Sequence, residues 1–522
     1  MATFVASVES QLEARQTTHR SDLPFASLLV SALTLFALAV HGYHPYAEDG
    51  GLYLAGVKRL LSPALYPQAT AFVLEPTRHS LFAPAVAAIT RLSHLPLPIV
   101  LLALHLATIW ATLFAAWMLA ARCWSTRTAR AGAVVLLACW LALPIAGTAL
   151  LLMDPYLTAR SLSTPCMVLA LIGALDATNQ IASRTQRQRG LALCIASIAL
   201  AAAMHPLMAA YALGATWMLL ALRSPNQRVR TWGTASLAAA ALILAACLQT
   251  VAKPETGDTI RVALTRTYWF PAEWAWYELL GLIAPLAILA FVAWRSPQNT
   301  RRSLAQMAVA SGITACLVAT LFSRATAATH LVARMQPLRA FQTVYLLMVL
   351  MLGAKLGEAV LRRSVWRWAA AILLLGGVML QAERTAFPNS DHAEFPWTAP
   401  RNAWTQAFLW IRANTPRDAL FALDADYINA PGEDAQCFRA LAERSALPDY
   451  SKDGGEASIA PDLTAAWKQG HAAQQHLSDL PDTARIAALA PLGVSWVVLK
   501  ASAATSLDCP YNNAAAKVCR LR

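Results

Sequence analysis

Two adjacent acids follow the first long apolar run of the sequence. The stretch HGYHPYAEDGGLYLAGVKRLL (41–61) places Glu48 and Asp49 before two glycines and an amphipathic segment. A carboxylate at this position can act as a general base that takes the proton of an attacking hydroxyl. We assign this role to Asp49 ahead of Glu48. Asp49 could instead cap the helix that begins there. Glu48 could orient an acceptor or share a divalent cation with His44.

Other polar residues gather where later apolar runs end. Arginine has a planar guanidinium that suits phosphate, and an ionisable residue beside an apolar run points to a buried partner. Asp154 could instead end a helix, His205 could be a turn residue, and the arginines could reach lipid headgroups. The candidates for binding a donor phosphate are Arg334, Arg339 and His205. The candidates for substrate contacts are His44, Tyr46, Asp154, Tyr156 and Arg160.

The composition predicts an α-helical polytopic membrane protein. The chain has 522 residues, of which 57% are hydrophobic and 14% charged, whereas soluble domains are about 25% charged. Apolar runs of membrane length recur along it. We expect about eleven transmembrane helices, near residues 23–41, 96–120, 131–151, 162–179, 190–204, 207–222, 232–250, 274–294, 303–322, 339–361 and 366–382. The segment 81–92 is too short to span and is expected to form an interfacial helix.

Arginines in short connections predict the orientation. The net charge of +13 could suggest nucleic acid, but arginine clusters between apolar runs are typical of cytoplasmic loops, so no nucleic-acid partner is expected. Because each span carries the chain to the other side of the membrane, we then expect a cytoplasmic segment 1–22, a transmembrane domain 23–382 with a first outer loop 42–95, and an outer domain 383–522. The clusters are Arg122, Arg127 and Arg130; Arg184, Arg187 and Arg189; Arg223, Arg228 and Arg230; Arg295, Arg301 and Arg302; and Arg362, Arg363 and Arg367.

The last 140 residues have a soluble character. They hold 16 of the 29 acids of the chain. Residues 419–424 and 494–500 have strand patterns, and residues 400–416 and 481–493 have helix-then-turn patterns, so an α/β domain is expected. Cys509 and Cys519 flank a potential hairpin. In an oxidising compartment they could form a disulfide or remain free thiols, and the sequence leaves both interpretations open.

The layout resembles the GT-C superfamily of integral-membrane glycosyltransferases. The resemblance rests on YHPYAEDGG after the first span, the interfacial segments 50–62 and 79–93, DPY at 154–156, and the end domain with FRALAERSALPDYSKDGG (438–455). No WWDYG-like motif of the oligosaccharyltransferases is present. The resemblance implies inverting transfer of a sugar from a polyprenyl-phosphate carrier to a glycan, lipid or protein acceptor, at the outer face of the bacterial inner membrane. A divalent metal ion is left open as a cofactor, with Glu48 and His44 as candidate ligands.

Two other functions compete with this interpretation. A transporter or flippase for a lipid-linked or anionic substrate would show repeats, broken helices and charges at mid-span. Few mid-span charges are present, and Pro144 is the best candidate for a helix break. The third function is a non-catalytic envelope assembly protein that keeps the fold.

Overall fold

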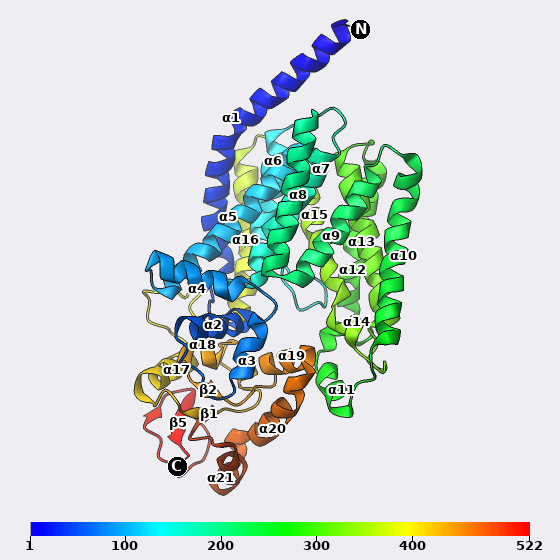
Figure 1. Cartoon of the computed structure of the whole chain (residues 1–522). Coiled ribbons are helices and arrows are strands. Elements are labelled where there is room, and N and C mark those ends of the chain that lie inside the picture. The colour runs from blue at the N-terminus through cyan, green and yellow to red at the C-terminus, as the bar shows by residue number, and fades with distance from the viewer. Residues whose placement is uncertain (1, 522) are drawn as a thin grey trace.

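The computed structural model describes the backbone of residues 2–521 and the side chains of residues 22–521. It shows a long helical bundle joined to a small domain that contains the β-sheet (Figure 1). The predicted fold class, a helical membrane-type bundle followed by an α/β domain, is therefore confirmed. The polar segment 1–22 was expected to be separate from the first span, but its backbone forms a single helix with that span, α1 (Ala2–His41). The side chains of this segment before Asp22 lie outside the described residues. Its expected cytoplasmic location stays a prediction.

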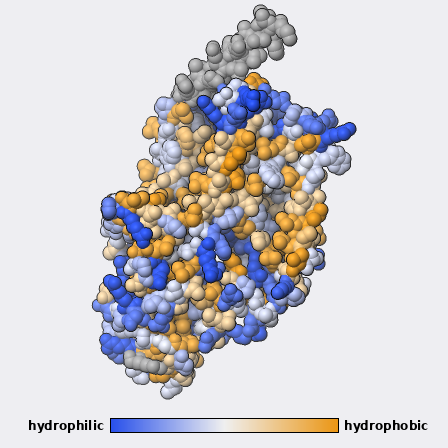
Figure 2. Space-filling model, viewed as in Figure 1, coloured by the Kyte–Doolittle hydropathy of each residue, from blue (hydrophilic) through white to orange (hydrophobic). Residues whose placement is uncertain are grey.

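Eight helical segments within the described residues are long and apolar enough to cross a membrane. Large apolar side chains remain exposed on several of them, for example Ile243, Phe291 and Leu373. Figure 2 shows this apolar surface over the bundle, with hydrophilic residues toward its ends. The segments are residues 22–41 of α1, α5 (Leu97–Cys123), α8 (Arg184–Met204), α10 (Gln227–Val251), α12 (Trp276–Arg295), α13 (Thr300–Phe322), Leu331–Leu361, which includes α14 (Leu331–Arg334) and α15 (Phe341–Leu356), and α16 (Val365–Ala386).

Three of the eleven predicted spans are not among these eight segments, so the predicted number of eleven spans is not confirmed. The segment predicted at 131–151 is interrupted, because α6 (Arg127–Cys139) ends after 13 residues. Residues 140–158 then fold back, with an isolated bridge between Pro144 and Leu151 and left-handed φ angles at Ala146 and Ala149. Proline lacks the N–H that a continuing helix needs. The other two segments are α7 (Ala159–Ala177), which is largely buried and contains Pro165, and α9 (Pro206–Leu222), which is about 26 Å long.

The arginine-rich connections share one end of the bundle. They join helices at the end opposite the small domain (Figure 1). At the other end lie short helices of the loop after α1, which are α2 (Glu48–Leu61), α3 (Thr70–Leu74) and α4 (Phe82–Ser93), and α11 (Gly257–Leu264) of a later loop. The short helices expected after the first span are therefore present. Every segment that carries a predicted site residue begins or ends near the small domain.

The C-terminal domain is an α/β unit around a five-stranded sheet. The strand order is β2 (Ser445–Ala446), β1 (Leu420–Ala422), β3 (Trp496–Lys500), β5 (Ala516–Arg520) and β4 (Tyr511–Asn512). The first two pairings are parallel and the last two antiparallel. Both predicted strands and both predicted helices are present. The helices are α17 (Ala403–Asn414), α18 (Phe438–Ala442), α19 (Lys452–Ile459), α20 (Thr464–Gln474) and α21 (Asp482–Leu489).

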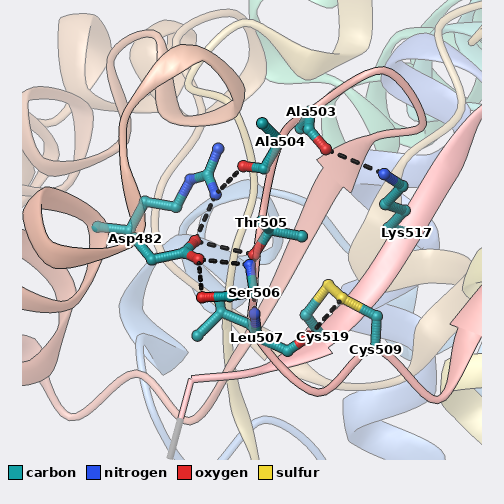
Figure 3. Close-up of a disulfide and its surroundings, with 10 residues drawn as sticks. Asp482, Ala503, Ala504, Thr505, Ser506, Leu507, Cys509, Lys517 and Cys519 are labelled. Carbon is teal, nitrogen blue, oxygen red and sulfur yellow. Dashed lines mark hydrogen bonds and ion pairs between the residues drawn. A yellow bond between two sulfur atoms is a disulfide. The ribbon is translucent and has the colours of Figure 1, made fainter.

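Both faces of this sheet are covered. Phe421, Trp496 and Val498 pack with helix residues on one side, and Leu420, Val497 and Leu499 pack on the other. The predicted hairpin at the end of the chain is closed by a disulfide between Cys509 and Cys519 (Figure 3). The same close-up shows Asp482 accepting hydrogen bonds from Thr505 and Ser506. These contacts join α21 and the last two strands within the domain. The domain begins after Ala386, because α16 continues past Glu383.

Candidate functional site

A cavity of about 1210 Å³ lies where the helical bundle meets the C-terminal domain. Its walls come from α2, the irregular segment 140–158, the starts of α7 and α9, the segment around Arg334, the end of α16, and α19. Most of the predicted site residues line this single cavity: Glu48, Asp49, Asp154, Tyr156, Arg160, His205, Arg334 and Arg339.

Asp49 is held by two cations from distant parts of the chain. Arg160 donates to one carboxylate oxygen over 2.8 Å, and Lys452 donates to the other over 3.2 Å. Burial alone would raise the pKa of Asp49, but the charges of Lys452 and Arg160 outweigh it and hold that pKa well below its ordinary value. Asp49 lies in the first turn of α2, and the N-cap residue Ala47 makes no side-chain cap bond. The carboxylate is therefore an ionised cavity group and not primarily a helix cap.

The C-terminal domain fixes the backbone at the start of α2. The Glu48 N–H donates to the carbonyl of Ala435 over 2.8 Å, and the Cys437 N–H donates to the carbonyl of Tyr46 over 2.9 Å. The Cys437 thiol also donates to the carbonyl of Glu48 over 3.1 Å. Glu48 has a φ of +50°, which a side chain rarely adopts unless its surroundings impose it. These contacts turn both carboxylates toward the cavity.

The two glycines after Asp49 serve packing. Both are buried inside α2. A Cβ at Gly50 would meet the ring of Tyr156, and a Cβ at Gly51 would overlap the carbonyl of Tyr46 and the side chain of Cys437. The pair therefore allows α2 to lie directly against the C-terminal domain and the segment before α7.

Arg160 joins Asp49 to a second carboxylate. It donates to Asp154 over 2.9 Å, and its side chain is only 8% exposed. Burial raises the pKa of Asp154 above its ordinary value. Thr158 caps α7 through a reciprocal pair with Ser161, and this cap places Arg160 in the first turn. The guanidinium fork thus positions the segment after the helix break against α2.

The predicted phosphate-binding residues differ in their contacts. Arg339 has no ion pair within the described residues, and its Nε is buried without a hydrogen-bond partner. Arg334 is paired with Glu255 at 2.7 Å and donates to the carbonyl of Ser458 over 2.6 Å, which leaves its Nη2 unpartnered. His205 accepts from the N–H of Met208 over 3.4 Å and so caps α9 while it lines the cavity. Arg339 is the cation most available to an anionic ligand.

His44 and Tyr46 are not part of the cavity lining. The His44 ring is buried and stacks on Phe387 with 4.0 Å between ring centroids. Tyr46 lies near Lys58, 5.8 Å from the ring centroid to the ammonium nitrogen. Neither position brings these rings to the substrate region that the sequence suggested.

The proposed metal ligands do not fit a metal site. Glu48 is bonded to Lys452, whereas the His44 ring stacks on Phe387 and does not line the cavity. Within the part of the chain that the structure describes, no group of three or more His, Cys, Asp or Glu side chains could hold a metal ion. We therefore derive no step through a metal.

Sequence reasoning missed the contribution of α19. Lys452 bonds to both Glu48 and Asp49, and Glu456, one turn later, also lines the cavity. Burial and the charges of Asp49 and Asp453 raise the pKa of Glu456 to about 8. The only signal in the sequence was that Lys452 lies within the end-domain string 438–455. Its contact with α2 spans 403 positions of sequence, and no local pattern indicates it.

Comparison with known proteins finds similarity to solved structures but not to a family model or a curated protein. The structure resembles the cryo-EM structure of the mycobacterial arabinofuranosyltransferase AftD, with a TM-score of 0.48 and 18% sequence identity. The similar region covers 92% of this chain and 37% of AftD, so the chain spans little more than a third of the length of that protein.

Proposed function

We propose that this chain is a membrane glycosyltransferase that moves a sugar from a polyprenyl-phosphate donor to an acceptor hydroxyl. The observation that carries the proposal is that one cavity contains both an ionised carboxylate, Asp49, and a guanidinium, Arg339, that has no side-chain partner among the residues the structure describes. Sugar transfer from a phosphate needs these two groups, a base for the acceptor and a cation for the leaving group. The resemblance of the sequence to the GT-C superfamily supports the same class of reaction.

The geometry supports a single displacement. The acceptor oxygen attacks the anomeric carbon, and its proton passes to Asp49. The bond from that carbon to the phosphate oxygen breaks, and the electron pair leaves with the phosphate. Attack from the face opposite the leaving group inverts the anomeric configuration. A weakly basic carboxylate suffices, because the hydroxyl becomes strongly acidic as its oxygen bonds to carbon.

The leaving phosphate is assigned to the arginine side of the cavity. Arg339 would stabilise most of the negative charge that develops on the phosphate. The free Nη2 of Arg334 and the ring of His205 would be further hydrogen-bond donors. Apolar residues of the same cavity, including Leu151, Leu207 and Met379, suit the first part of a lipid carrier. We place this end of the bundle at the outer face of the bacterial inner membrane, because the arginine-rich connections lie at the opposite end.

A transfer assay tests the proposal. The full chain, purified into lipid nanodiscs, would be incubated with a panel of radiolabelled polyprenyl-phosphate sugars and an extract of envelope glycans and lipids. We expect label from one donor to move to an acceptor, and the Asp49→Asn variant to lose this transfer. If no donor is consumed while a fluorescent polyprenyl-phosphate lipid crosses the bilayer of proteoliposomes, the chain is a transporter and the proposal fails.

A further inference from the structure

The first turn of α19 brings a lysine from the C-terminal domain into the bundle cavity. The Lys452 ammonium contacts Glu48 and Asp49 together, and its side chain is only 16% exposed. The charges of the two carboxylates outweigh burial and raise the pKa of Lys452 above its ordinary value. The lysine is therefore a cation at any physiological pH.

The ion-pair partners of Lys452 lie on α2 and not on its own helix, α19. Glu456 lies four positions later, which is the usual spacing for an ion pair within a helix. Lys452 instead reaches across to α2, and the Glu456 side chain makes no hydrogen bond or ion pair within the described residues. Because the partners of Lys452 lie on a different domain, this contact requires the two domains to be held in place.

The base of α19 is held rigidly. Asp449 accepts the Lys452 N–H over 2.6 Å, and Asp453 is paired with Arg439 at 2.6 Å. Asp453 also accepts the N–H of Asp449 over 2.8 Å. On the bundle side, Arg266 donates to the carbonyl of Ser451 over 2.7 Å. The lysine therefore begins from a fixed backbone, and only its own side chain has to be ordered for the ammonium to reach Asp49.

We propose that Lys452 is a positioning residue of this site, so that the C-terminal domain completes the catalytic centre by holding Asp49 oriented and ionised. The inference rests on the proposed function for the role of Asp49, and it adds that the helical bundle alone does not make a competent site. Arg160, the other cation on Asp49, is shared with Asp154. The full balance of charge on Asp49 therefore needs Lys452.

Several other groups act on Asp49 from the surrounding elements. On α2 they are Glu48 and Tyr53, and across the cavity they are His205 and Arg339. Before and on α7 they are Asp154, Tyr156 and Arg160, and on α19 Glu456 accompanies Lys452. Removal of Lys452 takes away one of the two cations that contact Asp49. The pKa of Asp49 should therefore rise, by about 1–3 units for the loss of a close opposite charge.

The test compares Lys452→Met with Lys452→Arg in the full chain. Lys468→Met is the matched control, because Lys468 also joins the C-terminal domain to a bundle loop, through Asp258 at 2.9 Å, but lies outside the cavity. Two properties are measured between about pH 2 and pH 8, because the acid limb set by Asp49 lies below the ordinary pKa of an aspartate, about 3.9. One is the sugar-transfer rate. The other is carbodiimide labelling of Asp49, which modifies the protonated carboxyl and is quantified by peptide mass spectrometry.

We expect the acid limb of the transfer rate to move up by about 1–3 pH units in Lys452→Met. Labelling of Asp49 at about pH 5 should rise about ten-fold or more, since each unit of pKa changes the protonated fraction ten-fold below the pKa. Lys452→Arg should restore both properties, and Lys468→Met should leave both unchanged. An unchanged labelling profile in Lys452→Met overturns the inference. If the wild-type chain transfers no sugar, the proposed function fails, and the labelling profile still decides the role of Lys452.

Discussion

Replacement of Asp49 by Asn is the most direct perturbation of the proposed chemistry. Asparagine keeps the size of the side chain and one oxygen acceptor, but it cannot take the acceptor proton. Its two cations are not left alone, because Arg160 keeps Asp154 at 2.9 Å and Lys452 keeps Glu48. The Asp49 side chain is also 29% exposed, so water screens part of each lost contact.

The cost to folding and the cost to catalysis should therefore differ. An orphaned buried charge would cost about 3–5 kcal/mol, but here the loss is confined to two charge-assisted hydrogen bonds, about 1–2 kcal/mol after screening. The loss of a positioned base lowers the rate by about 10²–10⁴-fold, which is about 2.7–5.5 kcal/mol of activation free energy. Catalysis should fail well before the fold does.

The assay measures transfer and donor binding on the same nanodisc preparation. Asp49→Asn should bind the radiolabelled donor with near wild-type affinity, keep a similar thermal unfolding midpoint, and lose the transfer rate. Asp154→Asn is the matched control, since it removes the other carboxylate of Arg160, and it should lose less than about ten-fold. Full transfer by Asp49→Asn would refute the reasoning and would move the base to another carboxylate of the cavity.

Four further outcomes are expected. Arg339→Ala should weaken donor binding about ten-fold or more, and Arg339→Lys should recover it only in part because the planar fork is lost. The control Arg324→Ala changes an exposed arginine outside the cavity and should not change donor binding; equal affinities of Arg339→Ala and the wild type would contradict the phosphate assignment. Because the pKa of Glu456 in the fold, about 8, lies above its unfolded value, stability should fall as pH rises toward about 8, and Glu456→Gln should abolish that fall in the thermal midpoint. Reduction of Cys509–Cys519 should cost the C-terminal domain about 2–3 kcal/mol, measured by chemical unfolding with and without reductant; an unchanged midpoint would count against a structural role. A reporter active only in the periplasm should work when fused after the last residue, and activity of a cytoplasmic reporter there would reverse the proposed orientation.

Part of the fold could be predicted from the sequence because its signals are local. Apolar run length identified eight segments that the structure also makes long and apolar, since a helix satisfies its own backbone in an apolar environment. Strand patterns located β1 and β3, and the spacing of Cys509 and Cys519 located the hairpin. The interruption after α6 was only partly visible. Pro144 indicated a break, but the return of the chain by Leu151 depends on packing.

The candidate site also combines features that the sequence predicts with features that only the tertiary structure shows. The sequence alone determined that Asp49 and Glu48 follow the first span and that Arg339 begins another, because each lies at the end of a local apolar pattern. Only the tertiary structure decided that Asp49 is clamped by Arg160, 111 positions away, and by Lys452, 403 positions away. In the tertiary structure, Arg339 also has no ion pair within the described residues, and His44 does not line the cavity. The physical reason is that an ion pair depends on distance in space, and no helical or strand period encodes contacts between segments so far apart in the chain.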